Sequence, residues 1–322
     1  MIVRWGLDEL PGVLAELGIA RPLLVASERW SPEDLPVDVA GVWSEVPSDR
    51  IGNAAAAVKD ADGVLALGGG SAIDLAKAIS AETGLPMVSV PTTYSGSEWT
   101  SSFGIRNKDR LRRGSGGGAN LAGIVYEPEL TIGLPTPESV GTALNALAHC
   151  AEALYVTGRN AQGDREAIAG AALISAWLPR VAEDGRDLEA RRGLLEGAMH
   201  GGAALASAGL GLGHAMAQAL GGRCGLPHGA LNAICLPAAL RFNEPVAGAE
   251  IARLGEAMGT DDPIGRVEGL ARLGGYERLR DLGVREEELG EVAEATAVRA
   301  GAKANPRPAV PAEVARLFRT VW

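Results

Sequence analysis

The sequence predicts an α/β domain built on a parallel sheet, followed by an all-helical domain. Up to about residue 135, short β-type runs alternate with helical runs at the spacing of βαβ units. From about residue 138 onward, alanine-rich helical segments follow one another. Between these parts, the two prolines of "LPTPE" interrupt hydrogen-bonded structure. We therefore predict domains at 1–135 and 136–322, with a ligand-binding cleft between them.

The order of elements in the first domain can be predicted from the same patterns. Apolar β-type runs predict strands, and alanine-rich runs predict helices, in the order strand 21–27, helix 48–61, strand 62–70, helix 71–84 and strand 85–93. The glycine-rich patch "RRGSGGGAN" at 112–120 predicts a mobile loop. In the second domain, glycine, proline and charged residues predict helix breaks near 158–163, 183–187, 221–229, 243–248 and 259–263.

Composition limits the classes of ligand. A net charge of −10 and a pI near 5.1 argue against a nucleic-acid or anionic-membrane surface, so small molecules are the expected ligands. No apolar run reaches the ~18 residues that span a bilayer, and the N-terminus lacks the order of a signal peptide, which predicts a cytoplasmic protein. The three cysteines lack CxxC spacing and are expected to be small buried side chains.

Two loops are predicted to bind a nucleotide. In "VLALGGGSAIDLAKAI", a strand leads through Gly68, Gly69 and Gly70 into a helix beginning near Ser71, and this arrangement suits a phosphate or pyrophosphate. Its structural alternative is that Ser71 and Asp74 form a capping box. The second loop, "VPTTYSGSEWT", follows the next strand and carries a cluster of hydroxyls, which includes Thr92, Thr93, Ser97 and Thr100. Its alternative is a locally bonded polar turn.

Three histidines of the helical domain form a candidate metal set. Asn145 and His149 share one face of the helix in "LNALAHCAEALY". His214 and His228 lie on either side of a helix break, a geometry that can direct both imidazoles into one cavity. Three such nitrogen ligands suit zinc, iron or nickel, while ordinary structural histidines remain the alternative. His200 is not part of this set and is expected to form its hydrogen bonds with local partners.

Taken together, these motifs resemble the iron-containing alcohol dehydrogenase superfamily. The matching segments are "GGGSAIDLAKA", "PTTYSGSE", "YEPELT", "NALAHCAEALY", "GHAMAQALGG", "LPHGALNAICLP" and "NPRP", and they are most similar to the maleylacetate reductase branch. The resemblance implies a dehydroquinate synthase-like architecture, with an N-terminal dinucleotide-binding domain and an all-α C-terminal domain. It also implies a metal set of one aspartate and three histidines, which falls on Asn145, His149, His214 and His228. Maleylacetate reductases commonly carry asparagine at the first of these positions.

The resemblance further implies an NAD(H)- or NADP(H)-dependent oxidoreductase of aromatic compound degradation. The protein is expected to be a homodimer. Hydride would pass to a small, acidic, unsaturated ketone similar to maleylacetate. His149, His214 and His228 would be catalytic, with or without a divalent metal (iron, zinc or nickel). The expected cofactor-binding residues are Ser27, Gly68, Gly69, Gly70, Ser71, Asp74, Thr92, Thr93, Ser97 and Thr100. Alternatives are a metal-dependent alcohol or polyol dehydrogenase, a dehydroquinate synthase-like lyase, and a nucleotide-binding protein without turnover.

The sequence departs from the family pattern at three places. Gln218 replaces a second histidine four residues after His214, and an amide cannot serve as a general acid near neutral pH. The lysine that the family pattern places between "GSE" and "YEPEL" is missing from its expected position, where the nearest basic residues are Arg110, Arg112 and Arg113. Ser27 replaces an aspartate that binds the adenosine ribose, which leaves NAD and NADP both open. For the carboxylates of the substrate, the candidate cations are Arg112, Arg113 and Arg223.

Overall fold

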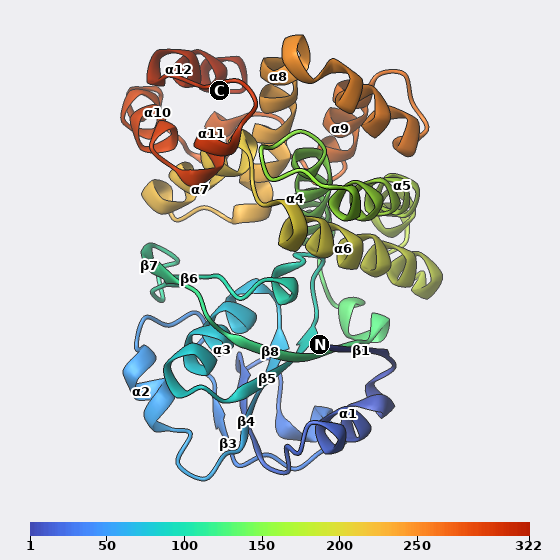
Figure 1. The fold of residues 1–322 in the computed structure, drawn as a ribbon, viewed down its shortest axis with the longest axis vertical. Coiled ribbons are helices and arrows are strands. Elements are labelled where there is room, and N and C mark those ends of the chain that lie inside the picture. The colour runs from blue at the N-terminus through green and yellow to red at the C-terminus, as the bar shows by residue number, and fades with distance from the viewer. The chain divides into compact units, whose positions relative to one another are not determined.

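A six-stranded, fully parallel sheet forms the centre of the first structural unit (Figure 1). The computed structural model describes residues 1–322. The strand order is β1-β8-β5-β4-β2-β3. The strands are β1 (Ile2–Trp5), β2 (Pro22–Ala26), β3 (Gly41–Trp43), β4 (Gly63–Gly68), β5 (Pro86–Pro91) and β8 (Asn120–Tyr126). The predicted α/β class and its parallel sheet are confirmed, while β1, β3 and β8 are additions to the predicted strands.

Both faces of this sheet are covered by helices, which explains why its strands are almost continuously apolar. Alternate side chains point to opposite faces, so Leu24 and Leu65 pack with helix α1 (Leu10–Glu16). Their neighbours Val25 and Val64 pack on the other face. That face is covered by helices α2 (Ile51–Ala56) and α3 (Gly70–Thr83).

The glycine-rich patch at 112–120 is not the mobile loop that its composition predicts. Strand β7 (Arg112–Gly116) pairs with β6 (Phe103–Arg106) in an antiparallel hairpin, and β8 begins at Asn120. Glycine is required at Gly116, where an added Cβ would lie 2.5 Å from the Phe103 ring. Gly116 therefore makes room for a cross-strand aromatic side chain, a role that composition alone does not reveal.

The second unit consists of helices. They are α4 (Thr136–Ala153), α5 (Ala161–Glu183), α6 (Leu188–Ala208), α7 (Leu212–Cys224), α8 (His228–Met258), α9 (Pro263–Arg272), α10 (Leu289–Ala297), α11 (Ala300–Ala304) and α12 (Pro311–Thr320). Four of the five predicted breaks separate helices, and the fifth is a kink at Ala247 within α8, two residues after Pro245. The break between α6 and α7 was not predicted. No helix is long and apolar enough to cross a membrane.

The two units are Met1–Thr93 with Ser97–Thr131, and Tyr94–Gly96 with Ile132–Trp322. Tyr94 is attached to the second unit by Arg191, a fully buried side chain of α6. The Arg191 guanidinium donates to the Tyr94 hydroxyl at 3.0 Å and to the carbonyls of Ile132 and Leu134 at 3.4 and 3.1 Å. One guanidinium thus anchors both segments of chain that enter this unit.

Candidate active site

The glycine loop lies at the carboxyl edge of the sheet, where open α/β sheets bind ligands. Strand β4 ends at Gly68, Gly69 is the N-cap of α3, and the helix begins at Gly70. In the neighbouring strand β5, Pro91 is the register partner of Gly68, so Thr92 and Thr93 emerge beside the loop. Ser27 follows β2, the neighbour of β4 on its other side. The structure therefore brings the predicted loops together at one sheet edge.

Two features of this edge suit an anionic ligand. Gly69 is tightly enclosed, because an added Cβ would lie 2.7 Å from Cγ2 of Thr93. The Thr93 hydroxyl is buried and has no hydrogen-bond partner. A helix N-terminus with bare glycines and an unused buried hydroxyl can hold a phosphate. The crowding by Thr93 also shows that Gly69 has a packing role.

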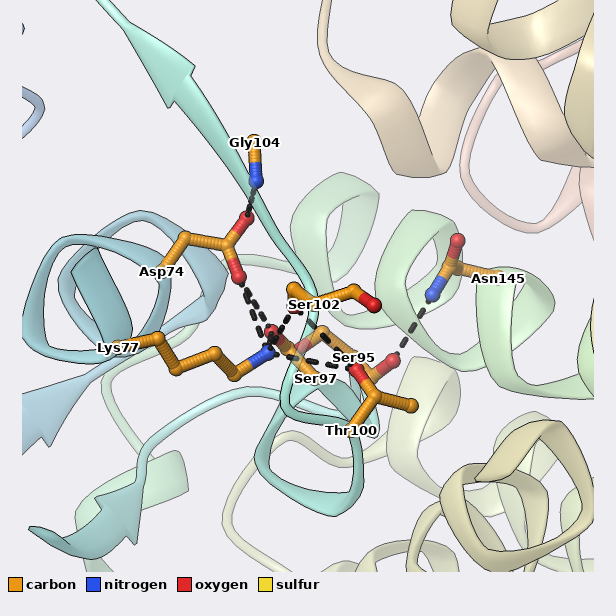
Figure 2. Close-up of polar contacts among 8 residues, drawn as sticks. All are labelled: Asp74, Lys77, Ser95, Ser97, Thr100, Ser102, Gly104 and Asn145. Carbon is orange, nitrogen blue, oxygen red and sulfur yellow. Dashed lines mark hydrogen bonds and ion pairs between the residues drawn. The ribbon is translucent and has the colours of Figure 1, made fainter. Parts of the chain in front are cut away.

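The predicted capping box is wrong. Ser71 is the second residue of α3 and does not cap it, because Gly69 takes the N-cap position without a side-chain hydrogen bond. Asp74 instead accepts hydrogen bonds from the Ser97 hydroxyl at 2.8 Å and from the backbone N–H of Gly104 at 3.1 Å (Figure 2). These bonds hold the second loop and the β6–β7 hairpin against α3.

Lys77 forms the centre of this network and was not singled out from the sequence. Its buried ammonium lies 3.2 Å from Asp74 and donates to the Ser97 hydroxyl at 3.0 Å and the Ser102 carbonyl at 2.9 Å (Figure 2). The Thr100 hydroxyl lies at 3.5 Å. Asp74, Ser97 and Thr100 therefore have internal partners, whereas Thr93 does not.

The three predicted histidines come together in the second unit. The rings of His149 and His214 are stacked with centroids 4.6 Å apart, and those of His214 and His228 are 5.8 Å apart. Burial, and then the neighbouring imidazoles, hold the pKa of His149 well below the usual histidine range. His149 is therefore neutral at physiological pH. His200 lies apart from the cluster and pairs with Glu166 at 2.7 Å, as expected of a locally satisfied side chain.

Glu152, one turn after His149 on α4, orients His214. Its fully buried carboxylate accepts from the backbone N–H of Gly211 at 2.6 Å and of His214 at 3.1 Å, and from Nδ1 of His214 at 2.7 Å. Gly211 is the N-cap of α7 and has no side chain, so Glu152 caps this helix from outside. Because an ionised carboxylate only accepts, Nδ1 carries the hydrogen. This places the lone pair on Nε2, which is buried and has no partner.

A chain of amides connects the other two histidines. The Asn145 amide nitrogen donates to the Ser95 carbonyl at 2.9 Å, which fixes the amide orientation (Figure 2). The Asn145 oxygen then accepts from Asn232 at 2.7 Å, and the same Asn232 nitrogen lies 3.0 Å from Nε2 of His228. The Asn145 nitrogen lies 3.5 Å from Nε2 of His149.

These contacts test the predicted metal set. Three imidazoles are the donor type that iron, zinc and nickel prefer, and Nε2 of His214 is available. In this arrangement, however, amide nitrogens face Nε2 of His149 and His228, and no group of three His, Cys, Asp or Glu side chains is arranged to hold a metal. A metal ion would therefore have to displace the amide contacts.

The arginines considered for the substrate carboxylates, and Gln218, have different surroundings. Arg223 is paired with Glu288 and Glu291, and the exposed Arg113 lies 3.9 Å from Asp49. Arg112 makes no such ion pair within its unit and donates to the Gly114 carbonyl at 3.3 Å. Gln218 is half-buried on α7, one turn after His214.

Comparison with known families identifies both units. The model described as "Iron-containing alcohol dehydrogenase" matches residues 4–117, and that described as "Fe-containing alcohol dehydrogenase family, C-terminal" matches residues 139–322. A maleylacetate reductase from Pseudomonas sp. (strain P51) is 34% identical over an alignment of 333 positions, which covers 98% of this chain and 93% of that protein.

Solved structures agree with these matches. A putative alcohol dehydrogenase from Ralstonia eutropha JMP134 superposes with a TM-score of 0.92 at 33% identity, covering 100% of this chain and 95% of that one. The maleylacetate reductase from Rhizobium sp. strain MTP-10005 superposes with a TM-score of 0.89 at 30% identity, with the same coverage. The resemblance predicted from the motifs is thereby confirmed.

Proposed function

Because the chain belongs to the iron-containing alcohol dehydrogenase family, we propose that it reduces a small, acidic, unsaturated ketone similar to maleylacetate with NADH or NADPH. It is an NAD(P)-dependent oxidoreductase. The observation that carries the choice of substrate is the similarity to maleylacetate reductases across nearly the whole chain. We further propose that it acts as a cytoplasmic homodimer.

The cofactor phosphates are assigned to the glycine loop. The N-terminus of α3 and the Thr93 hydroxyl would donate to them, and Ser27 would lie near the adenosine ribose. The Lys77 network would support this site by fixing the loop that carries Ser97 and Thr100. In this assignment, Asp74 positions the loop and does not contact the cofactor.

A bound nicotinamide would supply a hydride to the carbon–carbon double bond conjugated with the ketone. Negative charge would collect on the enolate oxygen, and a proton from water would complete the reduction. We assign the stabilisation of this charge to the imidazole cluster. His214 is the strongest candidate, because the Glu152 carboxylate fixes the orientation of its ring and its Nε2 has no other partner. His149 is neutral and would contribute only a hydrogen bond.

The test is oxidation of NADH and NADPH, followed by the absorbance of the nicotinamide, on mixing with maleylacetate. A neutral alcohol or polyol with the oxidised cofactor is the parallel assay, and both are repeated with chelator and with added iron or zinc. Turnover of maleylacetate is the expected result. Turnover of only the neutral substrate would identify a metal-dependent alcohol dehydrogenase, and the absence of both reactions would contradict the proposal.

A further inference from the structure

The β6–β7 hairpin carries an unusual concentration of positive charge. Between residues 106 and 113, five of eight residues are basic and one is acidic, in a chain with a net charge of −10. Within the hairpin, Arg106 and Arg112 are direct cross-strand partners. Like charges in that relationship destabilise a hairpin, so an ordinary surface would not favour this pair.

The two guanidiniums are near enough for their charges to interact. Burial lowers the pKa of Arg106, and the nearby charge of Arg112 lowers it further. Arg106 donates to the Arg110 carbonyl at 2.9 Å and Arg112 to the Gly114 carbonyl at 3.3 Å, and neither forms an ion pair within its unit. An arginine has five N–H donors, so most of these donors remain available for a ligand.

The pair lies beside the first turns of α3. Gly104 donates to the Asp74 carboxylate at 3.1 Å, and Arg106, two residues later on the strand, is influenced by the charge of the same carboxylate. The charge of Asp74 is itself offset by the buried Lys77 at 3.2 Å. The arginines therefore retain a net positive charge close to the helix that begins at the glycine loop.

We propose that Arg106 and Arg112 form a binding site for an oxyanion, either a carboxylate of the substrate or, alongside the glycine loop, the pyrophosphate of the cofactor. Two adjacent guanidiniums match the paired oxygens of either group, and the bound anion would relieve their repulsion. Arg113, the neighbouring residue in the sequence, is excluded because it is exposed and lies near Asp49. The identity of the two ligands rests on the proposed function, whereas the presence of an anion site does not.

The test compares Arg106→Gln, Arg112→Gln and their double variant with Arg113→Gln as the matched control. Dissociation constants for NADH and NADPH are measured by nicotinamide fluorescence. KM and kcat are measured with maleylacetate as the substrate. If the anion is a cofactor phosphate, the double variant should bind NADH or NADPH about 10- to 100-fold more weakly, the range expected for lost charge-assisted hydrogen bonds. If it is a substrate carboxylate, KM should rise by a similar factor while cofactor binding stays unchanged.

A stability measurement separates a binding role from a structural one. Without ligands, removing one of two repelling arginines should leave the urea midpoint unchanged or raise it, so weaker binding cannot be attributed to unfolding. A double variant that binds both cofactors and maleylacetate within about twofold of the wild type would overturn the proposal. If the wild type does not turn over maleylacetate, the proposed function fails, and the cofactor measurements still decide whether the arginines bind an anion.

Discussion

Glu152 and His214 form a fully buried carboxylate–imidazole pair in which the same carboxylate also caps the helix that carries the histidine. The orientation of His214 is therefore coupled to the position of α7 itself. A conventional N-cap side chain would satisfy only the helix, whereas this arrangement also selects the hydrogen-bearing nitrogen of the imidazole.

Glu152→Gln should destabilise the protein by about 2–4 kcal/mol and reduce turnover. The amide offers a single acceptor oxygen to three donors, and its own N–H groups would face backbone N–H groups. The free energy of unfolding in urea measures the first effect, and nitrogen NMR shifts of the His214 ring report its tautomer. Glu166→Gln is the matched control, because Glu166 also pairs with a histidine but is partly exposed, and should cost less than about 1 kcal/mol. Equal effects of the two changes would contradict the capping role.

Gly69→Ala should weaken cofactor binding strongly, and a second substitution reveals the reason. The added Cβ would meet Cγ2 of Thr93, and Thr93→Ser removes that methyl group. If the space at Gly69 is needed for a phosphate, the double variant should still bind NADH and NADPH poorly by fluorescence titration. Recovery of binding in the double variant would mean that Gly69 serves packing alone, with Thr93→Ser as the reference.

Asn145→Asp should tighten the binding of a divalent metal by about 1–2 orders of magnitude, because a carboxylate adds a negative charge beside three imidazoles. Without metal, the variant should be less stable by about 1–3 kcal/mol, since its carboxylate would face the Ser95 carbonyl in place of an N–H donor. Calorimetric titration with zinc and thermal unfolding measure the two effects. Asn243→Asp, at a buried asparagine pair outside the cluster, should lose stability without gaining metal affinity. Equal zinc affinity in the wild type and the Asn145 variant would show that residue 145 does not face the ion.

Glu98→Gln should stabilise the first unit at neutral and alkaline pH. Burial raises the pKa of Glu98, against opposing contributions from its backbone amide, the Tyr126 hydroxyl at 2.8 Å and the charge of Lys77. Since the folded pKa lies above the unfolded one, the wild type should lose stability as pH rises from about 4.3 through the folded value. The glutamine side chain does not ionise, so this contribution to the free energy of unfolding should be absent from the variant over this pH window. Urea unfolding at a series of pH values gives both curves, and parallel curves would refute the assignment.

Much of the fold follows from local pattern, because parallel strands buried on both faces are apolar and end in glycine or hydroxyl residues. The elements that escaped prediction lack such a pattern. The β6–β7 hairpin resembles a flexible glycine segment until Phe103 is seen against Gly116. The role of Arg191 depends on carbonyls more than fifty residues away in the sequence.

In the candidate site, the histidines could be predicted and their supporting residues could not. Glu152 follows His149 by three residues, Asn232 follows His228 by four and Lys77 follows Asp74 by three, so helical spacing offered a signal in each case. The signal was incomplete, however. Glu152 serves His214, not the histidine on its own helix, and only tertiary packing determines that choice.

The space around Glu152 also limits how this sequence can diverge. An added Cβ at Gly211 or Gly213 would approach the Glu152 side chain to 3.0 Å. A mutation that enlarges either glycine therefore requires the Glu152 carboxylate to shift by a few tenths of an ångström from the groups that it caps. Loss of the carboxylate would leave α7 uncapped until a new side chain at 211 replaced it. Residues 152, 211 and 213 should therefore vary together among homologues. A capping residue such as serine or aspartate at position 211 should occur with a non-acidic residue at position 152, and sequences with only one of these two changes should be rare.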